Sequence, residues 1–156
     1  PTFEEAYLKA ILAAGEKIPN PGSGVFFSAS DDAKPHLIDE AKALSAMGYK
    51  IYGTQGTHDF LRKYDIEISP LHKLRDKQSP NPLDGIKESK IQVIINIPDS
   101  RQTRDDAFLI RQEAIRHHIL CITTPEGAKA FVNGLQKMKD MSFSVHSLQE
   151  IHANQA

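Results

Sequence analysis

One segment constrains the fold more than any other. Residues 92–97 read Gln-Val-Ile-Ile-Asn-Ile, an apolar run made almost entirely of β-branched residues. Such a run is typical of a strand that is covered on both faces, as in parallel sheets flanked by helices. Four further segments read as short strands, at residues 25–27, 50–52, 67–71 and 120–122. Helical patterns alternate with these strands, so the sequence predicts an α/β fold: a three-layer α/β/α, Rossmann-like open sheet of about five parallel strands.

The helices are predicted from their start and stop signals. Thr2-Phe3-Glu4-Glu5 is a capping box, and Gly15 is placed to end the helix that it opens. The Pro- and Gly-rich residues 19–24 read as a linker, so we expect helix 2–14 to stand apart from the rest. The expected domains are a lead-in helix and linker, residues 1–22, and one globular unit, residues 23–156. A later helix, 106–117, offers four residues to the core: Phe108, Ile110, Ala114 and Ile115.

Residues 50–58, Lys-Ile-Tyr-Gly-Thr-Gln-Gly-Thr-His, read as a strand that ends in a tight turn and opens a helix. Gly53 and Gly56 would let the backbone approach a ligand, and Thr54 and Thr57 would place hydroxyls beside free helix N–H groups. An anion such as phosphate or carboxylate suits that environment. The alternative is an ordinary strand–turn–helix corner, because the segment matches neither G-x-G-x-x-G nor a GK[ST] loop.

The loops that follow the five strands meet at one edge of such a sheet, where ligands bind in this class of fold. Together they contain hydroxyls, amides and several cations. Their carboxylates are Asp31, Asp32, Asp76 and Asp99. This inventory indicates a phosphorylated small molecule, although the cations could also be solvated loop charges. The longest loop, residues 73–82, is expected to be functional or mobile.

Composition excludes several classes of function. At 156 residues the chain is expected to form a single folded core. A net charge of −1 does not indicate a positively charged surface for binding nucleic acid or a membrane. Cys121 is the only cysteine, which predicts a reducing, cytoplasmic location and a buried, inert thiol. The scattered histidines predict no metal site. Because the chain begins at Pro1 without a methionine, we expect it to be processed or cut from a longer protein.

Several segments resemble the methylglyoxal-synthase-like (MGS-like) domain that closes the large chain of bacterial carbamoyl phosphate synthase. They follow one another in the family's order and spacing. The matching segments are residues 2–6 with Lys9 and Ala10, residues 53–57, Pro80-Asn81, residues 93–96, Ile110-Arg111 and residues 147–153. The lead-in helix and the tail, residues 145–152, distinguish this branch from stand-alone methylglyoxal synthase.

The resemblance implies a regulatory domain that catalyses nothing itself. It would bind a nucleoside monophosphate, with UMP inhibiting and IMP activating the parent enzyme. That parent is an ATP- and Mg-dependent ligase for pyrimidine and arginine biosynthesis, with a synthetase body in the same chain and a glutaminase small subunit as partners. The domain itself would need no cofactor or metal.

The resemblance also places the effector site on particular residues. Lys73 would face the phosphate, and this cation favours a nucleotide over N-acetylglutamate, because the urea-cycle branch has an aromatic residue there. Ile97-Pro98 and Gln112 depart from the bacterial pattern. The effector and phosphate contacts would be Ser28, Lys34, Gly53, Thr54, Gly56, Thr57, Lys73 and Asn96, with Asp31, Asn81, Asp99, Arg101 and Thr123 as further candidate contacts.

The alternative function is methylglyoxal synthase acting on dihydroxyacetone phosphate. That reaction needs a carboxylate to remove a carbon-bound proton. Ser79 and Gln102 occupy the positions of the enzyme's catalytic aspartate and histidine, and neither side chain is a base near neutral pH. We therefore expect no catalytic residue. A third interpretation is an α/β domain whose crevice is empty.

Overall fold

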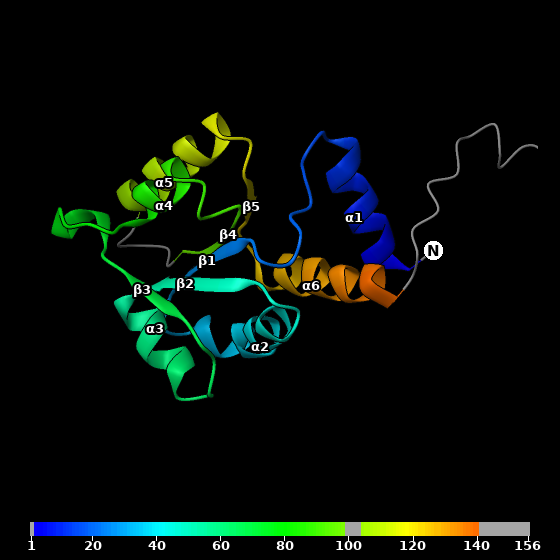
Figure 1. Cartoon of the computed structure of the whole chain (residues 1–156), viewed down its shortest axis with the longest axis horizontal. Helices are drawn as coiled ribbons and strands as arrows, with labels where there is room; N and C mark the ends of the chain where they lie inside the picture. Colours follow the sequence, from blue (N-terminus) through cyan, green and yellow to red (C-terminus); the bar gives the residue numbers. More distant parts are fainter. Residues whose placement is uncertain (1, 99–103, 141–156) are drawn as a thin grey trace, which may run out of the picture.

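The computed structural model describes residues 2–98 and 104–140, without the side chain of Arg104. Its centre is a sheet of five strands, all parallel, in the order β3-β2-β1-β4-β5 (Figure 1). The predicted α/β fold with about five parallel strands is therefore confirmed. The strands are β1 (Gly24–Ala29), β2 (Lys50–Thr54), β3 (Ser69–Leu71), β4 (Val93–Ile97) and β5 (Leu120–Ile122).

Helices cover both faces of the sheet. Figure 1 shows α2, α3 and α6 on one side and α4 and α5 on the other. The helices are α1 (Phe3–Ala13), α2 (Ile38–Ala46), α3 (Gln55–Arg62), α4 (Pro82–Lys87), α5 (Arg104–Arg116) and α6 (Pro125–Asp140), with 3-10 turns η1 (Lys34–Leu37) and η2 (Leu74–Asp76). None of the helices in this described part is long and apolar enough to cross a membrane.

The buried residues form one hydrophobic cluster on each face of the sheet. Val25 and Phe27 of β1 point into the larger cluster, with α2 and α6, while Phe26 points into the smaller one, with α4 and α5. This alternation follows from the two-residue period of a strand. The central strands β1 and β4 are apolar on both faces because each face is covered by helices.

The strand order reverses direction at β1. From β1 the chain crosses to β2 and β3 on one side, and later returns to β4 and β5 on the other. Ser28 of β1 pairs in register with Asn96 of β4, so these two polar residues lie side by side at the carboxyl ends of both strands. Open parallel sheets bind ligands at such a switch point.

Helix α1 does not stand apart from the domain, contrary to the expectation from the Pro- and Gly-rich linker. Its capping box is present as predicted, but Leu8 and Ile11 are buried in the larger hydrophobic cluster. A Cβ on Gly134 of α6 would lie 2.6 Å from Leu8 Cγ, so the two helices are in close contact. Lys137 Nζ also lies 3.0 Å from a carboxylate oxygen of Glu4. The Pro- and Gly-rich composition of the linker is compatible with a flexible connection. Burial of the apolar side chains of α1 against α6 nevertheless fixes the position of α1.

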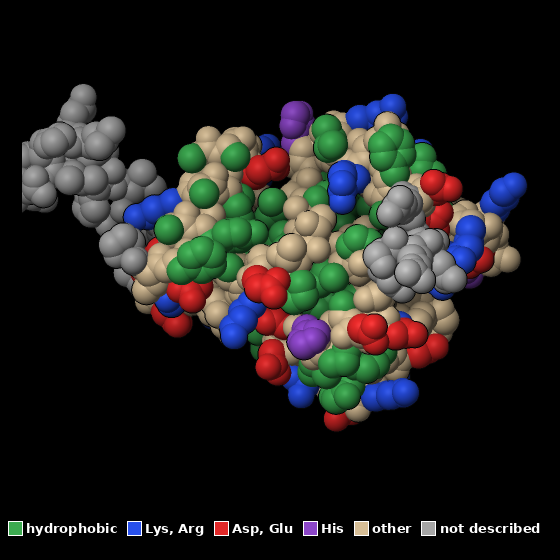
Figure 2. All heavy atoms as spheres, turned by 180° about the vertical axis from the view of Figure 1, so that it is seen from behind, with side chains coloured by type: hydrophobic (Ala, Val, Ile, Leu, Met, Phe, Trp, Pro, Cys, Tyr) green, Lys and Arg blue, Asp and Glu red, His purple; other side chains and the backbone are tan. Residues whose placement is uncertain are grey.

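Helix α5 buries fewer residues than the sequence predicted. Ile110 and Ala114 are buried, whereas Phe108 and Ile115 are 59% and 67% exposed. Hydrophobic side chains stand on the molecular surface over α5 in Figure 2. The helix contacts the sheet along a single i,i+4 stripe, and residues outside that stripe point away from it. The prediction that all four residues serve the core was therefore wrong for Phe108 and Ile115.

Candidate functional site

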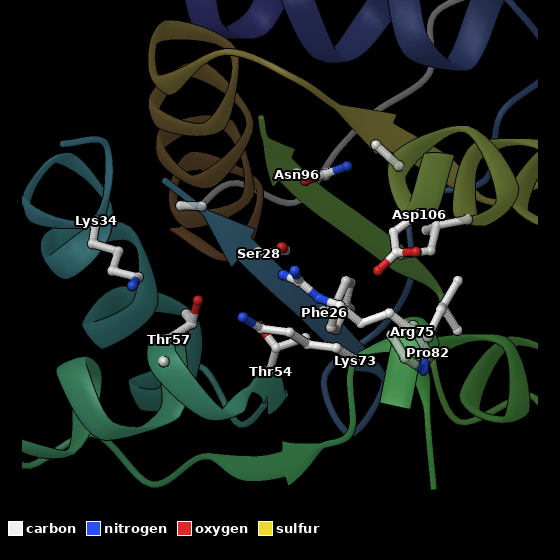
Figure 3. A pocket seen from close by; sticks show the side chains of 15 residues that line it. Phe26, Ser28, Lys34, Thr54, Thr57, Lys73, Arg75, Pro82, Asn96 and Asp106 are labelled. Carbon is white, nitrogen blue, oxygen red and sulfur yellow. The ribbon is translucent and has the colours of Figure 1, made fainter. Parts of the chain in front are cut away.

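A cavity lies at the carboxyl ends of β1, β2 and β4, where the strand order reverses (Figure 3). Most residues that the sequence analysis placed in an effector site line this cavity: Ser28, Lys34, Thr54, Gly56, Thr57, Lys73 and Asn96. Residues that the sequence analysis did not assign to the site also line it: Phe26, Ala29, Leu74, Arg75, Pro82, Asp106, Ala107 and Ile110.

The N-terminus of α3 forms one wall of the cavity. Thr54 is the N-cap residue, with an extended backbone, but its hydroxyl makes no capping hydrogen bond to the described residues of the helix. The first N–H groups of a helix have no intrahelical acceptor, so they and the Thr54 hydroxyl are available to a ligand. Thr57 is only 2% exposed, yet it lines the cavity. An anion placed here would face backbone dipoles and two hydroxyls together.

Two ammonium groups approach the same wall. In Figure 3 the side-chain nitrogens of Lys34 and Lys73 both point toward Thr57. The Lys34 side chain is only 12% exposed and forms an ion pair with Asp31. This hydrogen bond and charge lower the pKa of the Asp31 carboxyl, and the charge of Lys73 contributes in the same direction. Lys73 therefore lies close enough to act on Asp31, although the two residues come from different loops.

The two glycines of the corner have different roles. Gly56, in the first turn of α3, lines the cavity, and a Cβ there would lie 3.3 Å from Lys34 Nζ. Gly53 lies inside β2 and does not line the cavity, although the sequence analysis placed it beside the ligand. A Cβ on Gly53 would lie 2.8 Å from Ile68 Cδ1 and 3.3 Å from the Phe27 carbonyl oxygen. The close approach at Gly53 is therefore to the protein's own core.

This difference predicts opposite effects of alanine at the two positions. Gly53→Ala should destabilise the fold by about 1–3 kcal/mol, because packed atoms of Ile68 and Phe27 must move. Gly56→Ala should leave stability unchanged or raise it by up to about 1 kcal/mol, because alanine favours a helix and only a flexible lysine tip must move. Urea unfolding of both variants measures the contrast. Equal destabilisation by the two substitutions would contradict these assignments.

The further candidate contacts are more dispersed. Asp31 forms an ion pair with Lys34, which lines the cavity. Asn81 is the N-cap of α4 and forms a capping box with Asp84. Thr123 follows β5 and is exposed to solvent. None of these three lines the cavity. Asp99 and Arg101, with Gln102 and the tail 145–152, lie outside the described residues.

The loop expected over residues 73–82 is folded. It contains the 3-10 turn η2, and the N–H of His72 donates to the Pro80 carbonyl at 2.9 Å. The Ser79 hydroxyl donates to Asp84 at 2.8 Å, so Ser79 is held against α4 and does not line the cavity. Lys73, Leu74 and Arg75 are thereby presented to the cavity by a closed loop.

Two charged residues of the cavity were not identified from the sequence. Arg75 follows Lys73 by two residues in a cation-rich loop, and that spacing could have indicated it. Asp106 lines the cavity from the first turn of α5, and only the packing of α5 beside β4 brings it there. Figure 3 shows the Asp106 carboxylate on the side of the cavity away from Lys34. The site therefore has a cationic end and one acidic group opposite it.

The residue types favour binding over catalysis of proton transfer. Asp106 is the only carboxylate among the cavity residues that the structure describes, and no histidine lines it. Across residues 2–98 and 104–140, no group of three His, Cys, Asp or Glu residues could hold a metal ion. Cys121 is half-buried in the smaller hydrophobic cluster, and burial raises the pKa of its thiol, which makes it a weak nucleophile.

Comparison with known proteins identifies the family. The family model described as the MGS-like domain matches residues 36–123, more than half of the chain. The chain belongs to the MGS-like domain family. The resemblance that the sequence analysis drew from short segments is thus confirmed. The MGS-like match spans β2 to β5 and includes Thr54, Thr57 and Lys73, while Lys34 lies just before it.

Curated relatives place this MGS-like domain in a particular branch. The chain is 37% identical over 152 residues to the carbamoyl phosphate synthase large chain, C-terminal section, of Methanopyrus kandleri, covering 97% of this chain and 28% of that protein. It is 37% identical over 152 residues to the carbamoyl phosphate synthase large chain of Pasteurella multocida, covering 97% of this chain and 14% of that one. The chain thus spans between about a seventh and somewhat over a quarter of these relatives' length.

A solved structure shares the fold. Methylglyoxal synthase from Elizabethkingia anophelis NUHP1 matches with a TM-score of 0.58 over 72% of this chain and 79% of that one, at 12% sequence identity. At this identity the match concerns the arrangement of the sheet and helices, and function must be argued from the cavity itself.

Proposed function

We propose that this chain is the allosteric regulatory domain of a carbamoyl phosphate synthase large chain, and that it binds a nucleoside monophosphate such as UMP or IMP. The observation that carries the proposal is the convergence of Lys34 and Lys73 on the N-terminus of α3. Two cations, free helix N–H groups and the Thr54 and Thr57 hydroxyls match a phosphate monoester in charge and in hydrogen-bond donors.

The rest of the cavity suits the rest of a nucleotide. Asp106 is a hydrogen-bond acceptor opposite the cationic end, which fits the hydroxyls of a ribose. Asn96, at the end of β4, can donate and accept hydrogen bonds. Phe26 and Ile110 add apolar wall, as ligand cavities that hold an aromatic base require. A bare phosphate would use only one end of this cavity.

The relatives supply the context for regulation. Because they are large chains of carbamoyl phosphate synthase, we infer that this domain acts on a synthetase body in the same parent chain. That parent would use glutamine, through a glutaminase small subunit, and ATP with Mg, for pyrimidine and arginine biosynthesis. UMP as inhibitor and IMP as activator would act by binding two states of the parent with different affinity.

Calorimetric titration of this chain tests the ligand class. We expect UMP and IMP to bind, inorganic phosphate to bind more weakly and at the same site, and N-acetylglutamate not to bind. Competition between phosphate and UMP checks that one site is involved. Binding of N-acetylglutamate alone, or of none of the four compounds, would remove the basis for the proposal.

Methylglyoxal synthase is the second candidate, because the shared fold is that of such an enzyme. We expect this chain to form no methylglyoxal from dihydroxyacetone phosphate. The reaction requires a base and an acid acting together, and the described residues of the cavity include one carboxylate, Asp106, and no histidine beside it. A sensitive colorimetric assay measures this, with an authentic methylglyoxal synthase as the positive control. Ser79→Asp should remain inactive, because Gln102 still replaces the histidine. Product formed in proportion to the added protein would favour the enzyme.

A further inference from the structure

Helix α5 exposes a hydrophobic surface on the outside of the molecule (Figure 1). Six large hydrophobic side chains are exposed in the part of the chain that the structure describes, and three of them belong to this one helix: Phe108, Leu109 and Ile115. The fold itself uses the other side of α5, where Ile110 and Ala114 are buried in the smaller hydrophobic cluster. The exposed hydrophobic residues of α5 are therefore not explained by the core of this domain.

These exposed residues share one face of the helix. Phe108 and Ile115 are two turns apart and point in nearly the same direction, because an α-helix has 3.6 residues per turn. The other exposed residues on this side fall within about 120° of them around the helix axis. We call this the outer face of α5, and it consists of Asp105, Phe108, Leu109, Gln112, Ile115 and Arg116. The two exposed hydrophobic residues of α1, Phe3 and Leu12, lie on opposite sides of their helix and form no comparable face.

The charges on the outer face are ordered along the helix. Asp105 lies in the first turn of α5, and Arg116 lies in the last. The side chain of Arg116 is 73% exposed, and its Nη1 atom lies 3.5 Å from a carboxylate oxygen of Glu113. This long contact leaves most of the guanidinium donors available, since an arginine has five N–H groups. The outer face is therefore acidic at its N-terminal end, hydrophobic in the middle and basic at its C-terminal end.

We propose that the outer face of α5 pairs with the same face of a second copy of this chain, with the two helices antiparallel about a two-fold axis. Asp105 of each copy then lies near Arg116 of the other, and Phe108 of each lies near Ile115 of the other. Every such contact occurs twice, because a two-fold interface uses the same surface on both copies. The antiparallel arrangement also opposes the two helix dipoles. This self-complementary order of charges is what selects a second copy as the partner.

The interface is expected to be small, because each copy contributes mainly one helix. Interfaces of this size are typical of weak, reversible association, so we expect a Kd on the order of tens of micromolar. Asp106 and Ile110, which line the candidate effector cavity, lie on the opposite side of α5 from the outer face. Pairing therefore requires no ligand in the cavity, and the inference goes beyond the proposed function without depending on it.

Sedimentation velocity without nucleotide, over a range of protein concentrations that spans the expected Kd, tests the inference. The wild-type chain should pass from monomer to dimer. Phe108→Ser should raise the Kd about a hundredfold, because the buried apolar area is lost twice in each dimer. Asp105→Arg and Arg116→Asp should each raise it about tenfold, because each places two like-charged pairs at the interface. The double variant Asp105→Arg/Arg116→Asp should return close to the wild-type Kd, because the exchange restores both opposite-charge pairs.

Phe3→Ser is the matched control, since Phe3 is an exposed phenylalanine on another helix. It should leave the Kd within about twofold of wild type. All the substituted residues are exposed, so melting temperatures close to wild type separate a loss of association from a folding defect. A wild-type chain that stays monomeric throughout would overturn the inference, as would a dimer that Phe108→Ser does not weaken. Single charge reversals that weaken the dimer without recovery in the double variant would contradict the antiparallel pairing and also overturn it. None of these outcomes bears on nucleotide binding, so the proposed function is tested separately.

Discussion

Replacing Lys73 by alanine is expected to lower the affinity of this chain for UMP about ten- to a hundredfold. A hydrogen bond between charged groups contributes about 1.5–3 kcal/mol, and this ammonium group has no other partner within the described residues. Lys73 is partly exposed and belongs to no hydrophobic cluster, so the free energy of unfolding should stay within about 0.5 kcal/mol of wild type. Calorimetric titration and urea unfolding of the same preparation measure the two quantities.

Lys77→Ala serves as the control for this prediction, since it removes an exposed cation from the same loop without touching the cavity. In a full-length large chain, Lys73→Ala should flatten the response of the synthesis rate to added UMP. Unchanged binding of UMP by the Lys73→Ala variant would show that the phosphate lies elsewhere. A similar loss for Lys77→Ala would show that only the overall charge of the loop matters.

Leu8→Ala is expected to destabilise the whole chain by about 2–5 kcal/mol. Leu8 is 1% exposed and packs against α6 at Gly134, where no side chain can fill the space that the substitution leaves. Truncation therefore removes buried apolar contacts and creates a cavity between two helices. Chemical unfolding measured by far-ultraviolet circular dichroism gives the difference in free energy.

Leu12→Ala, on the same helix, is the matched control. Leu12 is 46% exposed, so the same chemical change should cost less than about 1 kcal/mol. If Leu8→Ala cost no more than Leu12→Ala, α1 would be only loosely associated with α6. A separate unfolding step for α1 in the wild type would point to the same conclusion.

The local elements could be predicted because short-range physics determines them. The β-branched run that forms β4 is typical of a strand covered on both faces, and it therefore indicates a parallel sheet. Thr2 and Glu5 form their capping box within four residues, so the start of this helix can be predicted from the local sequence. Because parallel strands share one carboxyl edge, Thr54 and Lys73 can be assigned to a common site from the sequence alone, and both line the same cavity.

Contacts between segments that are distant in the sequence could be identified only in the tertiary structure. The Pro- and Gly-rich stretch after α1 indicates a flexible linker, yet burial of Leu8 on α6 determines where the helix lies. Gly53 resembles a ligand-binding glycine in sequence, but Ile68 and Phe27 crowd it. Asp106 enters the cavity because α5 begins beside the end of β4, which no local pattern encodes.

Backbone propensities and hydrophobic periodicity act over a few residues, and they therefore define the strands and helices of this protein. Which side chains meet across the sheet depends on close packing between segments far apart in the chain, and that was decided only by the folded structure.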